Sequence, residues 1–146
     1  MVGIVRSSVL ANCIYLRAVK GLMEDANYLA VLAHDLAEGA ETEKVRDDIL
    51  YKIKFLRGYI QRYIPEDELI EMNLDFGRFL EIRIGLKPKE EWGNILGFLS
   101  ELEGLTEKAK TVQEYDEIAS SADLFADAML YVYIKRVLRC CGVKVL

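Results

Sequence analysis

Histidine and cysteine are scarce in this chain of 146 residues. The only histidine is His34, and the three cysteines are Cys13 and the adjacent Cys140 and Cys141. A single histidine and the absence of any CxxC pair argue against a structural zinc site. An odd number of cysteines with a vicinal pair is a poor disulfide framework, so we expect inert thiols in a reducing cytoplasm.

Long apolar runs and strand-like alternation are also missing. No uncharged apolar run reaches the ~18 residues that would indicate a transmembrane helix, so we expect no membrane association. The two prolines, Pro65 and Pro88, are each followed by acidic residues, as at helix starts. Helical periodicity predicts five helices, at residues 8–37, 42–63, 66–84, 89–109 and 112–139. Because the connections are short, we expect an all-α, single-domain bundle of about five antiparallel helices over residues 1–146.

The composition is rich in apolar residues and acidic overall. Hydrophobic residues make up 52% of the chain and the net charge is −5. Surplus apolar surface predicts a homo-oligomer or a protein partner. The negative net charge argues against nucleic acid as a partner. Abundant charged residues with few amide side chains are typical of thermophilic proteins.

The last predicted helix contains the run "SADLFADAMLYVYI" at residues 121–134, whose only charges are Asp123 and Asp127. A carboxylate in apolar surroundings is unfavourable unless it is paired, protonated or bound to a metal. We favour structural ion pairs with Lys52 or Arg17, on other predicted helices. The alternative is a hard-metal site for Mg²⁺ or Mn²⁺, completed by carboxylates of the 89–109 helix, such as Glu103 and Glu107.

The stretch "ADAMLYVYI" at residues 126–134 resembles the second half of the motif of the all-α NTP pyrophosphohydrolases, which include dimeric dUTPases and MazG-like enzymes. In that family EExxE and ExxD motifs on successive helices bind Mg²⁺. The resemblance implies that Asp127 matches the ExxD aspartate. The position three residues earlier is Leu124 instead of glutamate, and the 89–109 helix lacks the EExxE spacing.

A basic and aromatic stretch, "YKIKFLRGYIQRY", occupies residues 51–63. Arg46, Lys54 and Arg57 share the outward face of this helix, and such a face can bind phosphates. We favour a solvated face, because helical geometry places the aromatic residues on or near the buried side.

Three glycines, Gly93, Gly97 and Gly104, project from one side of the predicted 89–109 helix. Glycine inside a helix is unfavourable by up to ~1 kcal/mol relative to alanine, so three on one side suggest close packing against a helix. That helix belongs either to the same bundle or to a second subunit.

These observations favour a non-enzymatic interaction or assembly protein, self-associating and cytoplasmic, with no cofactor. The first alternative is a Mg²⁺- or Mn²⁺-dependent nucleotide pyrophosphohydrolase with a carboxylate cluster on the last two helices. The second alternative is a nucleic-acid-associated subunit that uses the basic face of the 42–63 helix.

Overall fold

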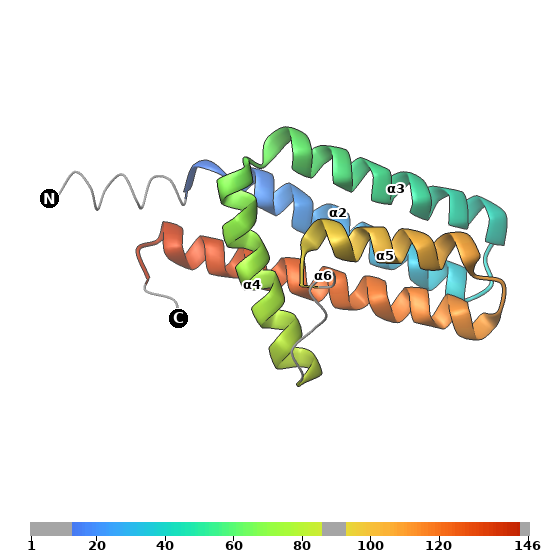
Figure 1. The fold of residues 1–146 in the computed structure, drawn as a ribbon. Coiled ribbons are helices and arrows are strands. Elements are labelled where there is room, and N and C mark those ends of the chain that lie inside the picture. The colour runs from blue at the N-terminus through green and yellow to red at the C-terminus, as the bar shows by residue number, and fades with distance from the viewer. Residues whose placement is uncertain (1–12, 86–92, 144–146) are drawn as a thin grey trace, which may run out of the picture.

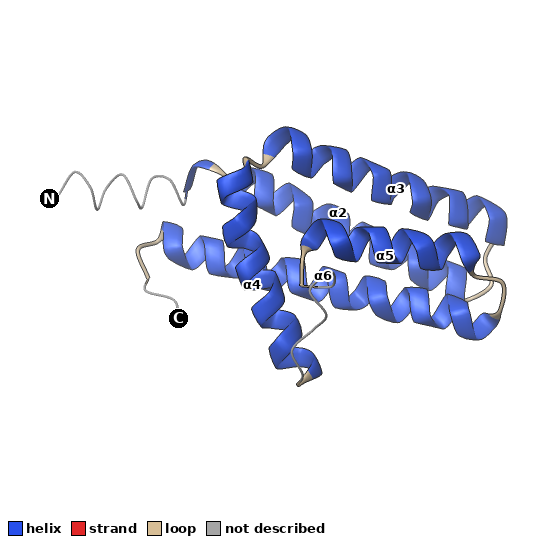
Figure 2. Ribbon diagram, viewed as in Figure 1, coloured by secondary structure: helices blue, strands red, loops and turns tan. Residues whose placement is uncertain are grey.

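The computed structural model describes residues 13–85 and 93–143, and 87% of these residues are helical. The helices of this part of the chain are α2 (Leu16–Ala37), α3 (Thr42–Tyr63), α4 (Glu66–Ile84), α5 (Ile95–Lys108) and α6 (Val112–Cys140), and none of its residues forms a strand (Figure 2). The predicted all-α bundle is therefore confirmed.

Four of these helices form an antiparallel bundle, and α4 crosses it (Figure 1). Helix α2 packs against α3 and α6, and α5 packs against the same two helices from the opposite corner. The expectation that all five helices are antiparallel is wrong for α4. Helix α5 begins near the end of the bundle where α3 finishes. A connecting helix parallel to the bundle axis would carry the chain to the opposite end, so α4 crosses the bundle instead.

Helix α6 contacts three other helices, α2, α4 and α5. Its buried side includes Phe125, which meets Phe76 of α4 and Phe98 of α5 at ring-centroid distances of 5.8 and 5.6 Å. Contacts with three helices give α6 a central position in the fold. The buried side of α3 consists of Val45, Ile49, Ile53, Leu56 and Ile60, which recur at helical spacing.

Side-chain caps explain where the last two helices begin. The side chain of Thr111 accepts a hydrogen bond from the Glu114 N–H, and Glu114 reciprocates, which is the capping box that "TVQE" predicts. Asn94 Oδ1 accepts hydrogen bonds from the N–H groups of Leu96 and Gly97, so α5 begins at Ile95 instead of residue 89. Pro88, which directly precedes the predicted start of this helix, lies outside the described residues.

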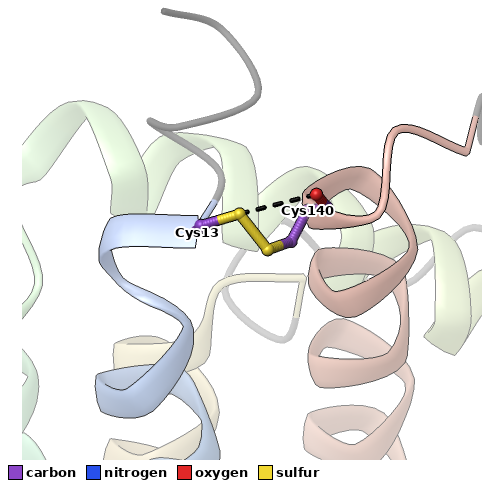
Figure 3. The surroundings of a disulfide bond; sticks show 2 residues. All are labelled: Cys13 and Cys140. Carbon is purple, nitrogen blue, oxygen red and sulfur yellow. Dashed lines mark hydrogen bonds between the residues drawn. A yellow bond between two sulfur atoms is a disulfide. The ribbon is translucent and has the colours of Figure 1, made fainter. Parts of the chain in front are cut away.

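A disulfide joins Cys13 to Cys140, which corrects the expectation of free thiols (Figure 3). Because α2 and α6 are antiparallel neighbours, the start of one lies beside the end of the other, and the two Cα atoms are 4.9 Å apart. The odd count fails as an argument because one cysteine, Cys141, stays free and exposed.

As for membranes, we find no span among the described residues, because none of their helices combines the length and the apolar character that crossing a bilayer requires.

Candidate functional site

The two aspartates of α6 pair with basic side chains other than those predicted. Asp123 Oδ2 lies 2.7 Å from His34 Nε2 of α2, and Asp127 Oδ2 lies 3.5 Å from Arg83 Nη1 of α4. Both carboxylate side chains are 48% exposed, so they are not on the inner half of the helix.

The predicted pairing with Lys52 or Arg17 is therefore wrong. Lys52 lies on α3, diagonally opposite α6 in the bundle, and its Nζ is 3.4 Å from Asp25 Oδ1 of α2. Arg17 lines a groove between α2 and α3, away from both aspartates. The prediction failed because helical periodicity does not reveal which helix is adjacent to which.

The structure does not bring the predicted metal ligands together. Glu103 of α5 points to α3, where its Oε1 is 3.1 Å from Arg57 Nη2, whereas Asp123 points to α2. Glu107 is exposed on α5. Across residues 13–85 and 93–143, no three His, Cys, Asp or Glu side chains form a group suited to a metal ion. The described residues thus give the Mg²⁺ or Mn²⁺ alternative no site.

The predicted basic face of α3 is divided by contacts within the bundle. Arg46 donates hydrogen bonds to the Ala109 carbonyl and to Tyr115 Oη, and Arg57 is paired with Glu103. Of the three predicted phosphate-binding residues, Lys54 is exposed, whereas Arg46 and Arg57 are partly buried. Arg46 and Arg57 therefore hold α3 to the α5–α6 corner, instead of forming one solvated surface.

The three glycines of the predicted close contact do not share one helical face. Gly93 precedes α5, and its carbonyl oxygen would lie 3.4 Å from a Cβ placed on Gly77 of α4. Gly97 lies in the first turn of α5, and a Cβ on Gly104 would meet no atom within 4 Å. Close packing inside the bundle is therefore not seen at Gly104.

Sequence reasoning missed a buried charge network between α4 and α6. Arg136 is 1% exposed and pairs with Glu68, which is 8% exposed. Arg139 makes two hydrogen bonds to Asp75, of 2.7 and 3.0 Å. Glu71 lies 3.7 to 3.8 Å from both arginines.

The network buries two carboxylates of α4, those of Glu68 and Asp75. A signal for it was present in the sequence, because Arg136 continues the row of Phe125, Met129 and Val132 on the buried side of α6.

Burial and hydrogen bonding shift the pKa values of two groups in this network, Glu68 and Arg139. Burial raises the pKa of the Glu68 carboxyl, and the attraction of Arg136 offsets only part of that effect. The hydrogen bonds from Arg139 to Asp75 raise the pKa of the Arg139 guanidinium, which therefore stays charged. The network ties α4 to the C-terminal half of α6 through groups that are largely hidden from solvent.

Two of the open grooves among the described residues carry opposite charge. The groove between α2 and α3, here called the basic groove, has a volume of about 750 Å³ and carries Arg17, Lys54 and Arg62. Its apolar lining includes Phe55, Tyr59 and Tyr63, which sequence analysis had placed towards the core. Phe55 and Tyr63 are in fact 43% and 50% exposed.

Tyr59 is fixed in the floor of the basic groove. Its hydroxyl donates a hydrogen bond of 2.8 Å to the Ala18 carbonyl. A Cβ placed on Gly21 would lie only 2.6 Å from the Tyr59 hydroxyl oxygen. Burial, reinforced by Asp25, raises the pKa of the Tyr59 phenol, so it stays neutral. Glycine at position 21 therefore allows α2 to approach the aromatic row of α3.

The second groove lies between α5 and α6 and is here called the acidic groove. Its volume is about 510 Å³, and its charged residues are Glu101, Asp116 and Glu117. Its apolar floor includes Leu102 and Leu124. Two aspartates of α6 therefore have different surroundings: Asp116 lines the acidic groove, whereas Asp127 pairs with Arg83 of α4.

No protein-family model matches the chain, and no curated protein or solved structure shows significant similarity to it. The comparisons therefore add no support to the resemblance between residues 126–134 and the NTP pyrophosphohydrolase motif, and functional inference rests on geometry.

Proposed function

We propose that the protein is a non-enzymatic interaction module that self-associates through the outer side of α4. The observation that carries this proposal is the exposure of three large apolar side chains on that helix. Ile70, Leu74 and Ile82 are 58%, 69% and 67% exposed. Several exposed large apolar side chains on one helix are a common feature of protein interfaces.

The inner side of α4 is already used within the bundle. Met72, Phe76 and Leu80 are fully buried, and Arg136 and Arg139 of α6 hold the helix by its carboxylates. The crossing orientation of α4 in Figure 1 sets its outer side apart from the four-helix bundle. A partner can therefore reach Leu74 without any rearrangement of the core.

A second copy of the chain suits this face because the face carries both charge signs. Asp67, Arg78 and Glu81 are exposed on α4 together with the apolar residues. A two-fold interface brings the same patch together from both subunits. A patch with both charge signs can pair acidic residues of one subunit with basic residues of the other. The apolar content of 52% agrees with a buried interface of this kind.

The test is the molar mass in solution, measured by light scattering at micromolar concentration. We expect at least a dimer for the wild type and a monomer for Leu74→Glu. Tyr51→Glu on α3 is the matched control, because Tyr51 is 70% exposed and Leu74 is 69% exposed. A wild-type monomer at all concentrations contradicts self-association.

The alternative interface for self-association is the side of α5 that carries Gly104. Gly104 has open space around it, so Gly104→Leu is expected to fold. Under our proposal this variant stays a dimer. A mass that falls in Gly104→Leu and not in Leu74→Glu would move the interface to α5.

We place the protein in a cytoplasm where disulfides persist, as they do in hyperthermophiles. The charge-rich composition with few amides supports a thermophilic origin, and the Cys13–Cys140 bond requires a compartment where disulfides persist. Alkylation of thiols at the moment of cell lysis tests it by mass spectrometry. One modified cysteine is expected, and three modified cysteines would indicate a reducing location.

A further inference from the structure

We infer that the basic groove binds a free amphipathic anion with a single charged head, of the long-chain carboxylate class. The inference concerns a small-molecule site between α2 and α3, and it is independent of self-association through α4.

The charge of the groove selects an anion. Arg17, Lys54 and Arg62 all line it, and none of the three forms an ion pair with another described residue. Lys52 and Arg57, on the same helix, are by contrast paired with Asp25 and Glu103. None of the described residues that line the groove is acidic, so its three cations are available to an anionic ligand.

The floor of the groove fits a flexible apolar chain better than stacked bases. Neighbouring rings of Phe55, Tyr59 and Tyr63 are tilted by 32° and 52°, so they do not form parallel platforms. Lys52 Nζ covers one face of Phe55 at 4.7 Å from the ring centroid. An acyl chain can lie along such ring edges, whereas base stacking needs open ring faces.

The size of the groove and the net charge of the chain support one small ligand. A volume of about 750 Å³ is within the range of small-molecule sites. The net charge of −5 opposes a polyanion at long range, whereas a single carboxylate is governed by the local cations.

Gly58 offers a way to block the groove without disturbing the fold. It lines the groove from the middle of α3, and a Cβ placed on it meets no atom within 4 Å. Leucine is also a better helix former than glycine, so Gly58→Leu is expected to fold at least as well as the wild type. Gly104→Leu on α5 is the matched control, since its position is equally open and lies outside this groove.

The experiment is a calorimetric titration of the full chain with sodium dodecanoate below its micellar concentration. We expect binding of one dodecanoate per chain, lost in Gly58→Leu and retained in Gly104→Leu. Arg17→Gln and Arg62→Gln should each weaken binding by roughly tenfold, which is the effect of losing one charge-assisted hydrogen bond. Lys44→Gln, at an exposed position of α3 outside the groove, should change nothing.

Two results would overturn the assignment directly: no dodecanoate binding by the wild type, or equal binding by the wild type and Gly58→Leu. Dodecyltrimethylammonium, which has the same chain and the opposite charge, tests the head group. If Gly58→Leu abolishes its binding as well, the groove does not select an anion. Binding to phosphatidylglycerol vesicles without binding to free dodecanoate would replace the proposed ligand by a membrane surface.

Discussion

The two halves of α6 carry charges of opposite sign in opposite surroundings. In the N-terminal half, Asp123 is half-exposed and pairs with His34, and Asp127, directly after the midpoint, is half-exposed and pairs with Arg83. In the C-terminal half, Arg136 is buried against Glu68, and the chain is covalently joined to the start of α2.

The difference teaches that an apolar run in a sequence does not show which of its charges are buried. Exposed ion pairs contribute about 0–1 kcal/mol, whereas loss of one partner of a buried pair costs about 3–5 kcal/mol. The prominent aspartates are therefore expected to matter less for stability than the less conspicuous arginine that follows them.

The largest effect is expected from the disulfide at the end of the C-terminal half. Cys140→Ser opens a loop with a sequence separation of 127 residues, and the chain-entropy model gives a loss of about 4–5 kcal/mol in the free energy of unfolding. Denaturant unfolding with and without dithiothreitol measures it. Cys141→Ser is the control and should have no effect, and an equal effect of dithiothreitol on wild type and Cys140→Ser would contradict the bond.

The next effect is expected from Arg136→Met. The change keeps an apolar stem and leaves Glu68 buried without its partner, so the free energy of unfolding should fall by about 3–5 kcal/mol. Lys44→Met, at an exposed position of α3 outside both proposed binding surfaces, is the control. The double variant Arg136→Met with Glu68→Leu should regain much of the loss, and a double variant as unstable as the single one would argue against a coupled pair.

A pH series sharpens the same comparison. Because burial raises the pKa of Glu68, the folded state binds its proton more tightly than the unfolded state. The contribution of this group is therefore most favourable below the ordinary glutamate pKa, and it is lost as the pH rises through the raised value. Glu68→Gln imitates the protonated form, so the stability of the wild type relative to this variant should fall with rising pH. A difference that is constant or grows in the other direction would contradict the shift.

The smallest effects are expected from the two paired aspartates of α6. Asp123→Asn and Asp127→Asn should each lower the free energy of unfolding by less than about 1 kcal/mol, because both pairs are half-exposed. Thermal melts measure this, and they should not change on addition of Mn²⁺. Stabilisation by Mn²⁺ in the wild type that is absent from Asp127→Asn would instead favour the metal-dependent alternative.

Periodicity and caps in the sequence were enough to predict the parts of the fold that depend on neighbouring residues. The buried row of α3, the capping box at Thr111 and the central position of α6 all follow from spacing along one helix. The crossing of α4, the partners of Asp123 and the Cys13–Cys140 bond depend on which helices become neighbours. Short connections limited the choices without deciding them, because α4 turns aside from the bundle axis.

The sequence identified some residues of the basic groove, but it did not show how they are arranged in space. The stretch at 51–63 drew attention to cations beside aromatics, and Lys54 and Tyr59 do line the basic groove. Arg17 was singled out as a partner for aspartates, yet it lies across this groove on α2. No pattern within one helix could place it there.

The Cys13–Cys140 bond also has a mechanical consequence. Tension applied to the chain outside these two cysteines passes through one covalent bridge and bypasses the helices between them. A sequence separation of 127 residues corresponds to roughly 400 Å of contour length, which stays hidden while the bond is intact. A single molecule pulled in an optical trap should release that length only after reduction. The redox state of this one bond therefore decides whether the bundle can be extended by force.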